Sequence, residues 1–164
     1  DRSWFVVGCG DLVPADPQIT GVAHFEGQVT GVMHVASTMD TIFADTQVYL
    51  HLYKTGSKED SIHHKWHVHA KPVDESGDCS TAGGHFNPFN SSLTTIQKVL
   101  NDLPHEAYEI GDLAGKLGTI AIPGPKTARR EVMAGRYFWT DESLPLIGGG
   151  SILNKAIVIH AENG

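Results

Sequence analysis

Short apolar runs separated by turn-forming residues recur along almost the whole of this 164-residue chain. In one of them Val48, Leu50 and Leu52 alternate with polar or aromatic neighbours, the pattern of a strand with one buried face. A Gly27-Gln28 link suits a hairpin between two such runs. The spacing predicts an all-β antiparallel sandwich or flattened barrel of about eight strands. The other candidate strands are residues 4–7, 22–26, 29–36, 63–69, 132–140 and 152–159.

One segment departs from the β pattern. Between residues 92 and 103 apolar residues recur at helical spacing, namely Leu93, Ile96, Leu100 and Leu103. Ser91 or Ser92 can cap the start of a helix, and Pro104 ends it. The sequence therefore predicts one short amphipathic helix near 92–103, lying over the barrel.

Composition and charge narrow the class of protein. The chain is 40% hydrophobic with 18 Gly and 8 Pro, which suits a single globular domain over residues 1–164. No apolar run approaches the ~20 residues of a membrane span. A formal net charge of −7 argues against nucleic acid as a partner, because phosphate binding needs a basic face. Ten His are unusually many and direct attention to metal binding.

A pair of His stands in one of the predicted strands. His67 and His69 are two residues apart, so both imidazoles lie on one face of the strand, roughly 7 Å apart along the backbone. Trp66 and Val68 then point to the opposite face and into the core. This pair can bind one metal ion from a rigid element, as a metal site requires.

Two further His extend the candidate site. His85 follows a Gly-Gly turn, and His160 ends the apolar run 156–159. Four neutral imidazoles suit copper best among the common biological metals, with zinc next. The four residues therefore predict a copper site, with zinc as the second choice.

At this point five separated motifs resemble the copper/zinc superoxide dismutase family, in the family's own order over about residues 22–164. The motifs are His67-Val68-His69, a loop carrying Cys79, Gly-His-Phe-Asn-Pro at 84–88, Gly-Asp-Leu at 111–113, and Val-Ile-His at 158–160. The resemblance implies a Greek-key sandwich and the disproportionation of superoxide to oxygen and hydrogen peroxide at copper. It also implies that the four copper positions are filled, by His67, His69, His85 and His160.

The zinc positions of the family are filled differently. Asp112 matches the zinc-binding Asp, but Glu109 stands where the family has His, and His105 is the only His between His85 and Asp112. This pattern resembles the fungal-type, extracellular copper-only dismutases, which bind no zinc. Glu109 and Asp112 would then orient His85 or a neighbouring ligand, and His85 would be the ligand that moves and carries a proton. A zinc site built from His85, His105, Glu109 and Asp112 stays open as the alternative.

The resemblance also concerns the end of the domain. Relatives continue past the last copper His into a strand with an Arg that guides the anion and, three residues later, a Cys that pairs with the loop Cys. This sequence stops four residues after His160, and residues 1–13 are the candidate for a displaced or permuted closing strand. Cys9 would pair with Cys79, and Arg2 is the candidate guiding residue, although it lies seven residues before Cys9.

The expected location is extracellular, secreted or at the cell surface. A Cys9–Cys79 disulfide would form in an oxidising compartment, and Asn90-Ser91-Ser92 is an acceptor sequence for N-glycosylation. Two free thiols and an unused acceptor sequence remain the alternative. The chain begins at Asp1, so we interpret it as a mature chain or an excised fragment, either a monomer or one repeat of a tandem array.

Two other functions stay open. A dismutase-like repeat with little catalysis could bind copper or haem through the His-rich stretch 63–69, with His63 and His64 as the extra ligands. A structural repeat could instead recognise another protein or a cell wall, with a vestigial metal site. Four intact copper His argue against this last reading.

Overall fold

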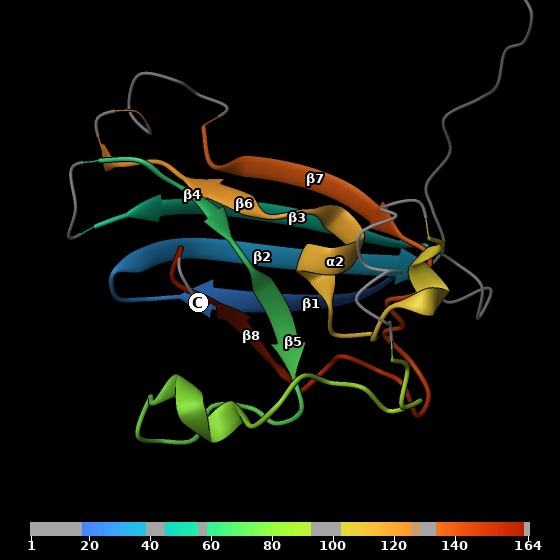
Figure 1. Ribbon diagram of the computed structural model, residues 1–164. Coiled ribbons are helices and arrows are strands. Elements are labelled where there is room, and N and C mark those ends of the chain that lie inside the picture. The colour runs from blue at the N-terminus through green and yellow to red at the C-terminus, as the bar shows by residue number, and fades with distance from the viewer. Residues whose placement is uncertain are drawn as a thin grey trace, which may run out of the picture.

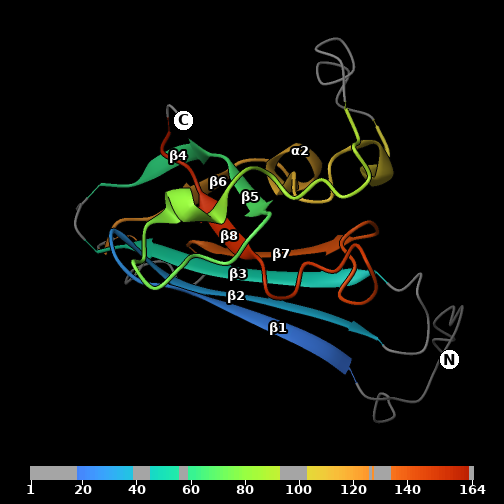
Figure 2. The same ribbon diagram turned by 90° about the horizontal axis from the view of Figure 1, so that it is seen from below.

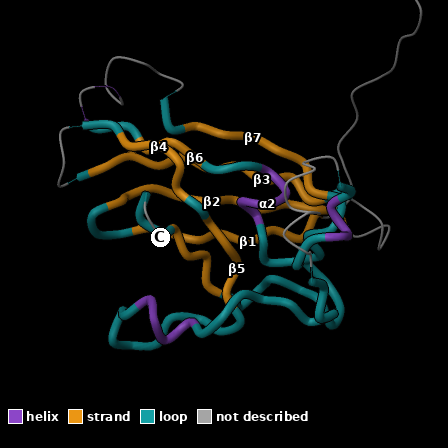
Figure 3. Tube along the Cα trace, in the orientation of Figure 1, coloured by secondary structure: helices purple, strands orange, loops and turns teal. Residues whose placement is uncertain are grey.

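Antiparallel strands dominate the regular secondary structure of this chain, of which the computed structural model describes residues 18–38, 45–55, 59–92, 103–125, 127 and 134–162 (Figure 1). Helical segments are short, as Figure 3 shows. The all-β class and the strand number predicted from the sequence are therefore confirmed. The strands are β1 (Gln18–Phe25), β2 (Val29–Thr38), β3 (Thr46–Lys54), β4 (Ser61–His64), β5 (Trp66–His69), β6 (Ile120–Ile122), β7 (Arg136–Asp141) and β8 (Ala156–Ile159).

The strands form two layers. One layer is a four-stranded sheet in the order β1-β2-β3-β7, and the pairs β4-β6 and β5-β8 face it from the other side (Figure 2). The chain crosses between layers after β3, returns for β7 and crosses again for β8, which is the expected Greek-key connection. The predicted hairpin at Gly27-Gln28 joins β1 to β2, where Gly27 adopts a φ of 136° that favours glycine.

The core lies between the two layers. Val48, Leu50 and Leu52 of β3 are fully buried, as their alternation predicted. From the opposite layer Trp66 and Val68 are also fully buried, which confirms the predicted inward face of their strand. Each buried aliphatic side chain of this size stabilises the fold by roughly 1.5–3 kcal/mol relative to an exposed one. The strand that carries the His pair is therefore held firmly by its other face.

The run 63–69 forms two strands instead of one. His63 has a φ of 62°, and the β4-β6 register shifts between Ser61 and His64, so the backbone bulges here. Beyond Lys65 the chain enters β5, which pairs with β8 instead of β6. The simple alternation of apolar residues did not reveal this break, because a bulge depends on the neighbouring strand.

Four small elements in the described residues were not expected: the strand β6, the helix α2 (Leu113–Leu117) and the 3-10 turns η1 (Cys79–Ala82) and η2 (His105–Ala107). The Asp112 side chain caps α2 by accepting a hydrogen bond from the Gly115 amide at 2.7 Å. Three to five residues are too few to produce a clear periodicity. Most of the predicted helix at 92–103 and the whole segment 1–13 lie outside the described residues.

Candidate metal centre

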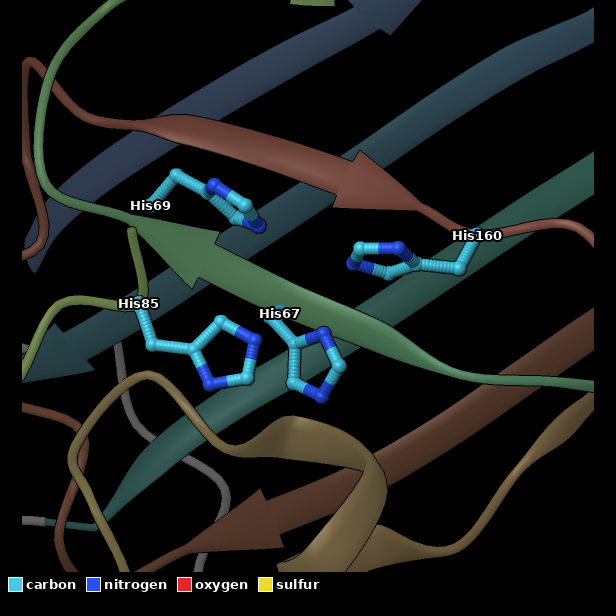
Figure 4. A group of neighbouring side chains, drawn as sticks. All are labelled: His67, His69, His85 and His160. Carbon is cyan, nitrogen blue, oxygen red and sulfur yellow. The ribbon is translucent and has the colours of Figure 1, made fainter. Parts of the chain in front are cut away.

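Three segments far apart in the sequence bring the four predicted His together. Strand β5 carries His67 and His69, a β-bridge pairs His69 with His85, and His160 follows β8, the neighbour of β5. The His160 amide donates to the Lys65 carbonyl at 2.9 Å. One ring nitrogen from each of the four His lies within 4.8 Å of the others, so a single metal ion can contact all four (Figure 4).

Hydrogen bonds orient two of the imidazoles. His69 donates from Nδ1 to the Gly83 carbonyl at 2.7 Å, and its buried Nε2 has no partner among the described residues. His85 donates from Nδ1 to Oε2 of Glu109 at 3.0 Å, so Nε2 is its remaining nitrogen. A metal ligand held through its second nitrogen in this way has a fixed tautomer and ring orientation.

Each of the other two imidazoles also has a buried ring nitrogen without a hydrogen-bond partner among the described residues. His67 Nε2 lies 3.5 Å from Oδ1 of Asp112, whereas its buried Nδ1 has no hydrogen-bond partner among the described residues. The buried Nε2 of His160 is unpaired in the same sense. An unpaired buried polar atom costs about 1–3 kcal/mol, so three of them aimed at one point need an explanation. A metal ion bound by the four nitrogens supplies it, and the donor set therefore fits copper.

Burial keeps two of the four imidazoles in the state that binds metal. It lowers the pKa of His69 and His160, and the neighbouring imidazoles lower both values further. Burial alone raises the pKa of Asp112, but hydrogen bonds from His67 and the Gly115 amide, with the charges of His67 and His85, bring it below its usual value. The site thus favours the neutral form of His69 and His160 and the ionised form of Asp112.

A ring of three backbone hydrogen bonds joins the segments of the site. The Val68 amide donates to the Gly111 carbonyl, the Gly111 amide to the Phe86 carbonyl, and the Phe86 amide to the Val68 carbonyl, each at 2.9 Å. A Cβ atom at Gly111 would collide with the Val68 carbonyl oxygen and approach the backbone of Phe86 to 3.0 Å. Only glycine fits here, next to the segments that carry His67, His69 and His85 and between the acidic residues Glu109 and Asp112.

One buried residue beside the site has a different role from the one considered in the sequence. His64 donates from Nδ1 to the His160 carbonyl at 2.8 Å, and its Nε2 accepts from the Ser61 hydroxyl at 2.6 Å. Both ring nitrogens are therefore engaged, which leaves His64 unable to serve as the extra copper or haem ligand considered above. The position of His64 three residues before His67 indicated that it lies near the site. It did not indicate which way the side chain points.

The two predicted acidic residues contact different imidazoles of the site. Glu109 contacts His85 and Asp112 contacts His67. His105, which with His85 would supply the nitrogen donors of the zinc alternative, instead lies with Nδ1 3.2 Å from Oδ1 of Asp141. Among the described residues only the four imidazoles gather into a group suited to a metal ion.

Other sequence predictions are not tested by the structure. Arg2 and Cys9 lie outside the described residues. Cys79 is an exposed free thiol, without a disulfide partner in the described part of the chain. The guiding role of Arg2 and the Cys9–Cys79 bridge remain predictions.

The comparison with known proteins agrees with this geometry. A family model described as copper/zinc superoxide dismutase matches residues 20–164. The chain belongs to this family. Cell surface Cu-only superoxide dismutase 5 of Candida albicans is 39% identical to it over 99 residues, which are 60% of this chain and 37% of that protein. Extracellular superoxide dismutase [Cu-Zn] of Brugia pahangi is 31% identical over 99 residues, 60% of this chain and 40% of that protein.

Solved structures extend the likeness to the fold. The Cu(II) form of Candida albicans superoxide dismutase 5 superimposes with a TM-score of 0.64 at 28% identity, covering 92% of this chain and 86% of that chain. The chain spans less than half the length of the curated relatives given above, at 37% and 40%.

Proposed function

We propose that this domain disproportionates superoxide at a single copper ion bound by four imidazoles, without zinc. Two superoxide anions and two protons yield one O₂ and one H₂O₂. The observation that carries the proposal is the set of three buried ring nitrogens without partners, on His67, His69 and His160, converging with a nitrogen of His85. Bound copper would supply the one-electron chemistry, taking an electron from one superoxide and giving it to the next.

His85 is suited to handle protons. Its side chain is 39% exposed, whereas those of His67 and His69 are buried, so it stands at the solvent side of the site. Oε2 of Glu109 accepts a hydrogen bond from Nδ1 of His85, which leaves Nε2 to alternate between metal ligand and proton donor. A carboxylate at Nδ1 also stabilises the imidazolium that forms when Nε2 takes up a proton. His85 would deliver that proton to the reduced oxygen.

Glu109 and Asp112 act through the ligands they contact. Asp112 is part of the cap of α2 and lies beside His67, so a rigid turn sets the orientation of that imidazole. Both carboxylates are thus positioning residues of the copper site. Because each is engaged with a copper His, and His105 contacts Asp141, the proposal includes no zinc ion.

The substrate is an anion, and the net charge of −7 repels it at long range. Local positive charge near the copper must offset this repulsion, for which superoxide dismutase is itself a known example. Arg2 remains the proposed guiding residue. We also propose that residues 1–13 supply the closing strand and that Cys9 pairs with Cys79. The domain would then be a monomer or one repeat of a tandem array.

We place the domain outside the cell or at the cell surface. Relatives named as cell surface and extracellular dismutases support this location. The glycosylation acceptor Asn90 is exposed, as modification requires. No described helix is long and apolar enough to cross a membrane.

The decisive experiment is the rate of superoxide decay, measured by pulse radiolysis with one copper and no zinc per protein. We expect a rate constant near ~10⁹ M⁻¹s⁻¹ that falls as salt is added. A slow rate that does not respond to salt would overturn the proposal.

A further inference from the structure

Lys116 of α2 and Asp141 at the end of β7 form an ion pair in which both side chains are completely buried. Nζ lies 2.7 Å from Oδ2, and the exposed fraction of each side chain is 0%. Burying two charges costs several kcal/mol per ion, and their attraction often only balances that cost. Such a pair is therefore poorly explained by stability alone, and its other contacts indicate what it does.

The Lys116 ammonium has two further acceptors. It donates to the Ile110 carbonyl at 3.0 Å and to the Ser143 hydroxyl at 3.3 Å. With Asp141 these contacts match the three N–H groups of an ammonium. Ile110 stands between Glu109 and Gly111, so Lys116 holds the loop 109–112 by its backbone.

Asp141 is itself fixed. Its Oδ1 accepts from the Ser143 amide at 2.9 Å and from His105 Nδ1 at 3.2 Å. Its buried Oδ2 faces the Lys116 ammonium at 2.7 Å and has no other partner in the described part of the chain, so this ammonium alone compensates that oxygen. The pair thus attaches the loop to the end of β7, in the opposite layer.

The loop leads directly to the metal centre. Gly111, next to Ile110, closes the backbone ring with Val68 and Phe86, which adjoin His67, His69 and His85. The loop residues on either side, Glu109 and Asp112, contact His85 and His67. A displacement of Ile110 would therefore reach both of these copper ligands.

We propose that Lys116 is a positioning residue of the copper centre: held by Asp141, its buried ammonium fixes the loop that orients His85 and His67. The positive charge that fixes this loop is thus a side chain of the protein. The inference rests on the copper site proposed above, and its test includes a measurement that needs no copper.

Two variants separate positioning from stability. Lys116→Met removes the ammonium at similar side-chain length but leaves Asp141 buried and unpaired. Lys116→Met combined with Asp141→Asn removes that unpaired charge while Oδ1 can still accept from Ser143. Lys71→Met is the control for Lys116→Met, because Lys71 is exposed and its loss changes the net charge by the same amount.

The first measurement is amide hydrogen exchange at Gly111 in the metal-free protein, with Leu50 of β3 as an internal reference for global unfolding. In both Lys116 variants we expect the protection of Gly111 to fall about tenfold relative to Leu50. The second is the Cu(II) electron paramagnetic resonance spectrum, whose g values and hyperfine splitting should change in both variants. The double variant should recover thermal stability without recovering the spectrum, and Lys71→Met should match the unmodified protein.

A double variant with unchanged Gly111 protection and an unchanged spectrum would overturn the inference, because the pair would then only stabilise the fold. If Lys116→Met does not fold, the double variant alone decides. Failure of the unmodified protein to bind copper through imidazole would instead count against the proposed function, while the metal-free exchange data would still test whether Lys116 fixes the loop.

Discussion

The Nδ1 of His64 lies 2.8 Å from the carbonyl oxygen of His160, a hydrogen bond between residues 96 positions apart. It connects the bulged end of β4 to the residue that follows β8, and Ser61 holds the other ring nitrogen. The His160 amide is bound at the same place, by the Lys65 carbonyl. The last residue of the proposed copper site is therefore held through both its backbone amide and its backbone carbonyl.

Substitution of His64 by Leu should weaken copper binding by roughly ten- to a hundredfold, as outer-sphere changes do at other metal sites, because His160 loses its carbonyl anchor. Competition with a chromophoric copper chelator measures the effect. His63→Ala is the control, since His63 is exposed. Equal affinities of the two variants would contradict the anchoring role.

Glu109→Gln should slow superoxide decay by about tenfold or more, because the amide keeps a hydrogen bond to His85 but no longer stabilises its protonated form. Copper content should stay within about twofold of the unmodified protein, since the four imidazoles remain. Pulse radiolysis and metal analysis test both statements, with the exposed Glu75→Gln as the control. An unchanged rate would show that His85 needs no carboxylate.

Gly111→Ala should destabilise the metal-free protein by roughly 1–3 kcal/mol, because the added methyl group forces the backbones of Val68 and Phe86 apart. Chemical denaturation gives the free energy of unfolding. Gly149→Ala serves as the control, since a Cβ atom there meets no atom within 4 Å. Identical stabilities would mean that the backbone ring tolerates a side chain.

The pKa of Asp112 lies below its usual value of 3.8, so its ionised form stabilises the folded protein. This contribution is complete above the unfolded pKa and is lost as pH falls through the lower folded value. Asp112→Asn should therefore lower the stability of the metal-free protein near pH 6, and the difference should shrink below about pH 4. Urea denaturation at several pH values measures it, and a difference independent of pH would contradict the assignment.

Much of the site followed from local patterns. Successive side chains of a strand point to opposite faces, so the sequence alone predicted that Trp66 and Val68 point into the core and that His67 and His69 share the other face. Trp66 and Val68 are indeed fully buried. His85 after a Gly-Gly turn and His160 after an apolar run were also predicted from short motifs, and the resemblance to a family agreed with both. The bulge at His63 and the helix α2 were missed, since both depend on contacts with neighbouring segments.

Residue patterns along the chain were enough to predict the all-β class, the strand that carries the His pair and the four imidazoles proposed to bind copper, since strand alternation and short motifs act over a few residues. Only the tertiary structure decided which nitrogen of each imidazole is left for the metal, that Glu109 serves His85 while Asp112 serves His67, and that Lys116 and Asp141 are buried together. These relationships join segments tens of residues apart. Packing of the two layers sets their distances and burial, and no local pattern contains that information.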